Sequence, residues 1–277
     1  MNIIHAIILG IVEGVTEFLP ISSTGHLTIA EKLLGYTVDL PAITAFTAVV
    51  QVGSIAAAVV YFWKDIVRIA RAWVSGLFDQ EKRSHDYRMG WYIIIGTIPV
   101  AIVGLALKHM IETTFRGLWV VIAGLALWSI VMYIADRASN EKRHTEDMTW
   151  KDALFMGVMQ CFALVPGVSR SGATISAGLF RGIDRVSATR LSFYLGIPAL
   201  VAAGGLEAVT QAKQISQHVG WGAMTIGIIT AFIVGYFSIA WLLKFVAHHS
   251  FRPFVMYRVG LALVVALLIT SSVITSN

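Results

Sequence analysis

The chain has few of the features that hold soluble domains together. Its one cysteine, Cys161, excludes an intrachain disulfide and a CxxC redox motif. Only 13% of its 277 residues are charged and 57% are hydrophobic, whereas about a quarter of a soluble domain is charged. No polar or Pro- and Ser-rich stretch suggests an interdomain linker, and the first residues lack the basic region of a signal peptide. We therefore expect an all-α polytopic membrane protein with a single membrane domain over residues 1–277.

The basic balance of the chain does not point to nucleic acid. The formal net charge is +5 and the sequence pI is about 9.4, but the lysines and arginines concentrate in loops between apolar runs. That distribution is the topology signal of a membrane protein. Membrane lipid is therefore an expected partner and nucleic acid is not.

Six apolar runs are long enough to cross about 30 Å of hydrocarbon as helices. Tryptophans mark several of their ends, as expected for side chains that prefer the headgroup level. The predicted transmembrane helices cover residues 43–62, 91–107, 118–135, 191–209, 221–243 and 256–273.

Two further apolar segments, residues 3–34 and 153–180, are interrupted by proline and glycine. We predict that both are re-entrant helical hairpins, which are tolerated at membrane depth only inside protein or beside water. They align without a gap at an offset of 147, with three spans after each. This pattern predicts an inverted-topology repeat, with halves at about 1–135 and 153–273. The aligned pairs are Gly10 with Gly157, Glu13 with Gln160, Ser22 with Ser169, Thr24 with Ser171, and Gly25 with Gly172.

Loop charge predicts the orientation. With both termini outside, the inside loops hold 16 lysines and arginines and the outside holds four, in agreement with the positive-inside rule. The first hairpin then enters from outside. The inside loops are 64–90, 136–152, 181–190 and 244–258, the last ending at Arg258, and the outside cations are Lys32, Lys108, Arg116 and Lys213.

The first hairpin carries the motif GIVEGVTEFLPISSTGH, residues 10–26. Glu13 and Glu17 lie four residues apart, on one helix face, and carboxylates in an apolar segment are costly enough to suggest function. Pro20 ends that helix. A second helix is predicted from about His26, and its N-cap candidates are Ser22, Ser23 and Thr24.

The second hairpin carries VPGVSRSGAT, residues 165–174. Its Pro-Gly break opens a short helix, whose free N–H groups and positive dipole end favour an anion. Arg170 adds a forked donor suited to phosphate oxygens. If the two tips meet, they form one pocket with Ser169, Ser171, Gly172 and Thr174.

Carboxylates beside an anion site imply a bridging hard cation, Mg²⁺ or Ca²⁺, held by Glu13 and Glu17. Ser23 and His26 lie three residues apart, as a nucleophile and its base could. The implied reaction is phosphoryl transfer to water, with Arg170 and the metal stabilising charge. Ser23, His26 and a metal-bound water are all left open as the attacking group.

The motifs EGVTEFLPISSTGH and PGVSRSGAT resemble the two signatures of the undecaprenyl-diphosphate phosphatases of the bacitracin-resistance type, and the resemblance extends along the whole chain. It implies an enzyme of the bacterial plasma membrane that removes one phosphate from undecaprenyl diphosphate, with its site facing outward and a divalent cation required. It also implies that Glu13 and Glu17 are the acidic pair, that Ser23 and His26 act in the first motif, and that Ser169, Arg170 and Thr174 act in the second.

Other interpretations stay open. Ser23 could be only an N-cap, and a secondary transporter or lipid flippase shares the inverted-repeat architecture. A lipid phosphatase with a PSGH motif is less favoured, because no histidine follows Arg170 before His218. A homodimer is left open.

Overall fold

The computed structural model describes residues 1–277 except 38–39, 108–109, 111–116, 273 and 276–277. Two of the predicted outside cations, Lys108 and Arg116, therefore lie outside the described residues. The described part is helical and contains no strand, apart from an isolated bridge between Arg143 and Ile183. The helices are α1 (Ile3–Thr16), α2 (Ser23–Leu33), α3 (Pro41–Tyr61), α4 (Trp63–Phe78), α5 (His85–Ala106), α7 (Leu118–Ala138), α8 (Trp150–Gln160), α9 (Arg170–Phe180), α10 (Arg185–Thr210), α11 (Ala212–Gln214), α12 (Trp221–Val246) and α13 (Arg252–Thr270).

Six of these helices are long and apolar enough to cross a membrane, counted over the described residues: α3, α5, α7, α10, α12 and α13. Each overlaps one predicted run, so the prediction of six spans is confirmed by length and composition. The boundaries differ most at α5 and α10, which begin six residues earlier than expected, at His85 and Arg185. The side chains of Ser84 and Asp184 cap the N-termini of these two helices. Hydropathy does not detect such caps, so it placed both helix starts too late.

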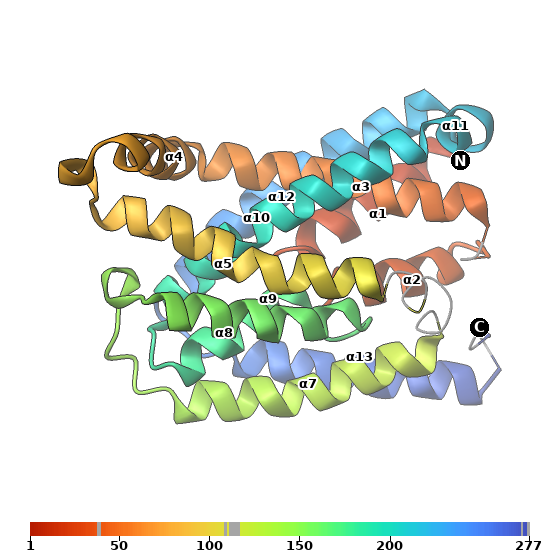
Figure 1. The fold of residues 1–277 in the computed structure, drawn as a ribbon. Helices are drawn as coiled ribbons and strands as arrows, with labels where there is room; N and C mark the ends of the chain where they lie inside the picture. Colours follow the sequence, from red (N-terminus) through yellow and green to blue (C-terminus); the bar gives the residue numbers. More distant parts are fainter. Residues whose placement is uncertain (38–39, 108–109, 111–116, 273, 276–277) are drawn as a thin grey trace.

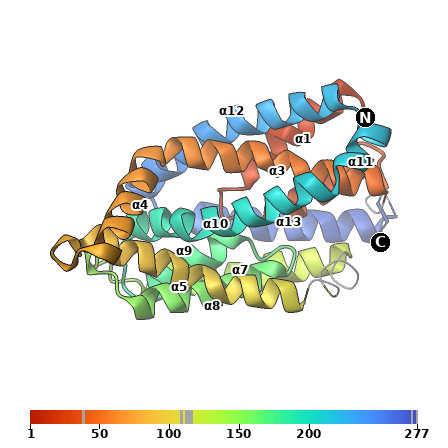
Figure 2. The same cartoon turned by 45° about the horizontal axis from the view of Figure 1, so that its top comes forward.

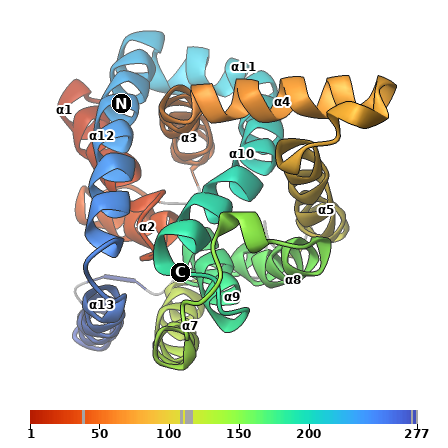
Figure 3. The same ribbon diagram turned by 90° about the vertical axis from the view of Figure 1, so that its left-hand side faces the viewer.

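The long helices run side by side along one axis (Figures 1 and 2). The start of α1 and the end of α13 lie at the same end of this bundle (Figure 1). Part of the predicted inside loop 64–90 is in fact the helix α4, which lies across the opposite end and projects beyond the bundle (Figure 3). The two ends of the bundle therefore differ, because only one of them carries α4.

Two helices are broken, as predicted. The first breaks between α1 and α2 around Pro20, and the second between α8 and α9, where a 3₁₀ turn (Cys161–Leu164) leads into Pro166 and Gly167. Both restart from a serine with positive φ, Ser22 at 77° and Ser169 at 76°. Of the three N-cap candidates in the first motif, the cap is Ser22, so α2 begins three residues earlier than expected.

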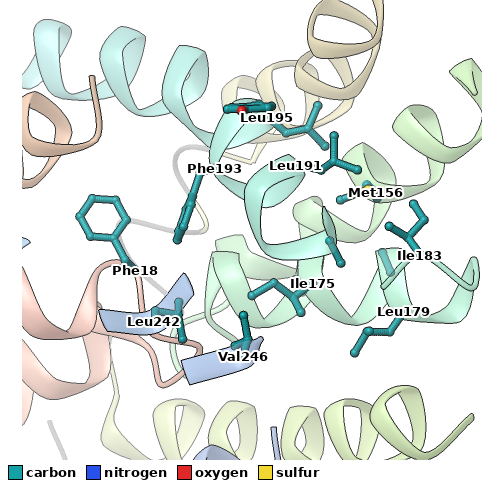
Figure 4. Packing of buried hydrophobic residues seen from close by; sticks show 14 of the residues in the cluster. Phe18, Met156, Ile175, Leu179, Ile183, Leu191, Phe193, Leu195, Leu242 and Val246 are labelled. Carbon is teal, nitrogen blue, oxygen red and sulfur yellow. The ribbon is translucent and has the colours of Figure 1, made fainter. Parts of the chain in front are cut away.

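The hydrophobic core packs around the two breaks. Phe18 from the first break faces Phe193 of α10 at 5.6 Å between ring centroids, with Ile175 of α9 and Leu242 of α12 beside them (Figure 4). Close helix approach also depends on small residues: a Cβ at Gly14 of α1 would stand 2.8 Å from the carbonyl oxygen of Ala231 in α12. This packing leaves little freedom to the polar groups at the breaks.

Candidate active site at the two helix breaks

The two breaks touch each other through hydrogen bonds. The Ser22 hydroxyl accepts from the Gly167 N–H at 3.2 Å, and the Ser171 hydroxyl donates to the Leu19 carbonyl at 3.1 Å. All four groups are buried. Each break therefore supplies a side chain that satisfies a backbone group of the other, and the expectation that the two tips meet agrees with this geometry.

A chain of three polar side chains crosses between the breaks. Arg170 Nη2 lies 3.4 Å from Glu17 Oε1, and the Ser23 hydroxyl donates to Glu17 Oε2 at 2.7 Å. Arg170 also donates through Nη1 to the Ser192 carbonyl of α10 at 3.3 Å. Glu17 is thus held by a cation on one side and a hydroxyl on the other, in a buried position.

Glu13 lies one turn before Glu17 on α1 and is fully buried. Neither of its carboxylate oxygens has a hydrogen-bond partner among the described residues, and the same is true of the side-chain oxygen and nitrogen of Gln160, its counterpart in the second half. A buried carboxylate without a hydrogen-bond partner is unfavourable. A ligand that bonds the Glu13 oxygens would remove this cost.

The second motif is organised by its serine cap. The Ser169 hydroxyl accepts from the Gly172 N–H at 3.2 Å and lies 3.1 Å from the Ser171 hydroxyl. The Thr174 hydroxyl lies 2.6 Å from that of Ser192 in α10.

Both helix starts also offer free backbone N–H groups. The first backbone bonds of α2 and α9 come from the His26 and Ala173 N–H groups, so the amides of Ser23, Thr24, Arg170 and Ser171 precede them.

The histidine of the first motif is bonded at both ring nitrogens. His26 Nδ1 lies 2.7 Å from the Ser22 carbonyl and must donate to it, while Nε2 lies 2.7 Å from the Tyr257 hydroxyl of α13. The Tyr257 ring stacks on His26 at an interplanar angle of 8°. The expected Ser23–His26 hydrogen bond is not formed, since Ser23 bonds Glu17 instead. Thr24 is exposed beside them.

Arg258 corrects one prediction. We counted it among the inside loop cations, but it lies in α13 with a fully buried side chain. Its guanidinium donates to the Pro20 carbonyl at 3.1 Å and the Gly167 carbonyl at 2.8 Å, one from each break. It also bonds the Ser129 hydroxyl of α7 at 3.1 Å. This role cannot be seen in the sequence, because an arginine near a span end looks like an interfacial cation.

Two residues of α10 that lie outside both motifs, Ser192 and Gly196, also constrain the position of the Arg170 side chain. The Ser192 carbonyl accepts from its guanidinium, and Gly196 lies so close that a Cβ there would overlap Arg170 Nη1 and stand 2.7 Å from Cζ. Nothing in the local sequence marks either residue, because each acts only through its distance to Arg170.

Comparison with known proteins identifies the family of this chain. The family model for the bacitracin resistance protein BacA matches residues 6–264. A protein of Frankia casuarinae named undecaprenyl-diphosphatase 3 is 53% identical over 278 residues, which cover 100% of both chains. The undecaprenyl-diphosphatase of Cutibacterium acnes is 55% identical over 284 residues, also 100% of both chains. That of Acidothermus cellulolyticus is 52% identical over 275 residues, 99% of each. The chain therefore belongs to the bacitracin resistance protein BacA family.

Proposed function

We propose that this protein hydrolyses undecaprenyl diphosphate to undecaprenyl phosphate and inorganic phosphate, and in this way confers bacitracin resistance. Family membership and full-length relatives named undecaprenyl-diphosphatase support the activity and the substrate. The observation that carries the proposal in the structure is the contact of Glu17 with both Ser23 and Arg170, across 153 positions of sequence in the case of Arg170.

We assign a role to each of these groups from their contacts. The Ser23 hydroxyl already donates to Glu17, so Glu17 takes the proton as Ser23 Oγ attacks the terminal phosphorus. The bond between that phosphorus and the bridging oxygen breaks, and undecaprenyl phosphate leaves. Water then attacks the same phosphorus and gives a proton to His26 on the more exposed side of the site. The bond from phosphorus to Ser23 Oγ breaks, Oγ takes back the proton held by Glu17, and inorganic phosphate leaves.

Hydrogen-bond donors from both halves of the chain stabilise the negative charge on the transferred phosphoryl group. Arg170 and the free amides at the starts of α2 and α9 surround the same region, and a helix N-terminus favours a phosphate. Ser22, Ser169, Ser171 and Gly172 hold these helix starts in place, and Thr174 does so through Ser192. Thr24 contributes its backbone amide.

We also propose a bound divalent cation, Mg²⁺ or Ca²⁺, held by Glu13 and Glu17. The residues fit such an ion, because the Glu13 oxygens are buried without a partner and carboxylate oxygens are hard ligands. No group of three or more acidic, histidine or cysteine side chains suited to a metal occurs among the described residues, so substrate phosphate oxygens would complete its ligands. When bound, the ion supplies positive charge that offsets the repulsion between the carboxylates and the diphosphate.

The proposed setting is the bacterial plasma membrane, with the broken helices as re-entrant hairpins of an inverted repeat and the site facing outward. The matching positive-φ caps, Ser22 and Ser169, stand 147 positions apart, the offset at which the motifs align, which supports the repeat. The excess of inside cations supports the orientation, even though Arg258 no longer counts among them.

The direct test is phosphate release from undecaprenyl diphosphate by purified protein in detergent, with and without a chelator. We expect Glu17→Gln and Arg170→Ala each to lower the rate by 10²-fold or more, while the matched controls Glu81→Gln and Arg252→Ala, at exposed positions, keep it. Thermal unfolding of each variant separates lost chemistry from lost folding. Wild-type rates for Glu17→Gln would refute the site.

A carrier that moves an intact anion is the competing function. It would need the anion site but not a hydroxyl bonded to a carboxylate, so the Ser23 to Glu17 contact favours hydrolysis. Transport of undecaprenyl phosphate into liposomes without phosphate release would favour the carrier.

A further inference from the structure

Helix α4 differs from the rest of the fold, because it lies across one end of the bundle and not along it (Figure 3). One of its faces is packed: Ile69 is buried, a Cβ at Gly76 would meet the Tyr87 ring, and Trp73 lies against Trp91 of α5 at 5.5 Å between centroids. This packing fixes which face of α4 is turned outward.

The outward face of α4 is apolar and exposed. Trp63 is 58% exposed, Val74 48% and Phe78 86%, and at about 100° per residue these side chains share one face with Val67. Leaving such a stripe in water is unfavourable by about 25 cal/mol per Å². A helix with this pattern and a basic edge is typical of one lying in the plane of the membrane interface.

The edge of that face carries uncompensated positive charge. Lys64 and Arg71 are exposed, and neither forms an ion pair within the part of the chain that the structure describes. Arg68 lies between them but is paired with Asp65 and Asp86. The three cations, together with Trp63 and Val67, line a shallow hollow of about 430 Å³.

We propose that this hollow binds the headgroup of an anionic phospholipid, with its phosphate between Lys64 and Arg71 and an acyl chain along Trp63 and Val67. The unpaired cations favour an anionic ligand. The apolar side chains beside them favour a lipid over free phosphate. A second copy of the chain fits less well, because a symmetric contact would bring its own Lys64 and Arg71 against these cations. The lipid site is independent of the phosphatase site.

The test titrates purified protein in detergent with phosphatidylglycerol or phosphatidylcholine and counts bound lipids by native mass spectrometry. The double variant Lys64→Gln with Arg71→Gln should bind phosphatidylglycerol about 30-fold more weakly, which corresponds to about 1 kcal/mol per cation. Its phosphatidylcholine binding should not change. The matched control is Lys244→Gln with Arg252→Gln, which removes two exposed cations at the end of α12 and the start of α13 and should leave phosphatidylglycerol binding within twofold of wild type.

Thermal unfolding and phosphate release of both double variants should match wild type, since neither pair touches the core or the active site. Equal losses of phosphatidylglycerol binding in the two double variants would indicate a diffuse surface potential instead of a specific site. Unchanged binding in the double variant Lys64→Gln with Arg71→Gln would also overturn the proposal. A shift in the proportion of dimer without a change in lipid affinity would assign the face to a second copy instead.

Discussion

Replacing Gly196 by alanine should move the guanidinium of Arg170 without touching any residue of the two motifs. The α10 backbone at Gly196 lies under that guanidinium, so the added methyl would overlap Nη1 and stand 2.7 Å from Cζ. Because carbon atoms in contact stay about 3.5 to 4.0 Å apart, Cζ must retreat by about 1 Å.

That retreat acts on two contacts that are already long. Arg170 reaches Glu17 at 3.4 Å and the Ser192 carbonyl at 3.3 Å, so a further 1 Å breaks at least one of them. A misplacement of about 1 Å in a catalytic group costs about 10²-fold in rate. Folding should hardly suffer, because the displaced atoms end a flexible side chain and alanine favours helix over glycine by about 1 kcal/mol.

The measurement is phosphate release and thermal unfolding of Gly196→Ala beside Gly205→Ala on the same helix, where a Cβ meets nothing within 4 Å. We expect release to fall about 100-fold in the first variant only, with unfolding temperatures within about 2 °C of wild type for both. Full activity of Gly196→Ala would refute the idea that the α10 backbone positions Arg170.

Three further changes test other contacts. Arg258→Met leaves the buried Pro20 and Gly167 carbonyls without their donor and should cost about 3 kcal/mol, a fall of about 6 °C in unfolding temperature, whereas Arg252→Met at the exposed start of α13 should cost almost nothing. Tyr257→Phe keeps the ring on His26 but removes its hydroxyl, so kcat should fall about tenfold with KM unchanged; a change in KM alone would point to substrate binding instead. Burial by itself raises the pKa of Asp152, but hydrogen bonds from two arginines and a threonine outweigh it and hold the pKa below its usual value. The charged Asp152 carboxylate therefore contributes its full stability above about pH 4, and this contribution is lost as the pH falls toward the folded-state pKa. The free energy of unfolding of Asp152→Asn should be about 2 kcal/mol lower than that of wild type at pH 7, and calorimetry should show this difference shrinking at lower pH.

The local features of the site were predictable because their signals are local. Pro20 and the Pro166-Gly167 pair break their helices where the sequence places them, and a serine caps each restart. The meeting of the two tips, and so of Glu17 with Arg170, was expected from the aligned motifs and from their chemistry. The hydrogen-bond partner of Ser23 was not predictable in this way: spacing along one helix favoured His26, but the folded chain brings Glu17 to its hydroxyl.

The sequence by itself determined the membrane class, the six apolar helices and the two breaks, because hydropathy, periodicity and proline or serine chemistry act over a few neighbouring residues. Only the tertiary structure decided that Arg258 holds both breaks, that Gly196 sets the place of Arg170, and that Tyr257 covers His26. Those contacts join helices far apart in the chain, and their distances depend on how closely whole helices pack. A glycine or an arginine in an apolar run carries no local sign of which partner that packing will bring to it.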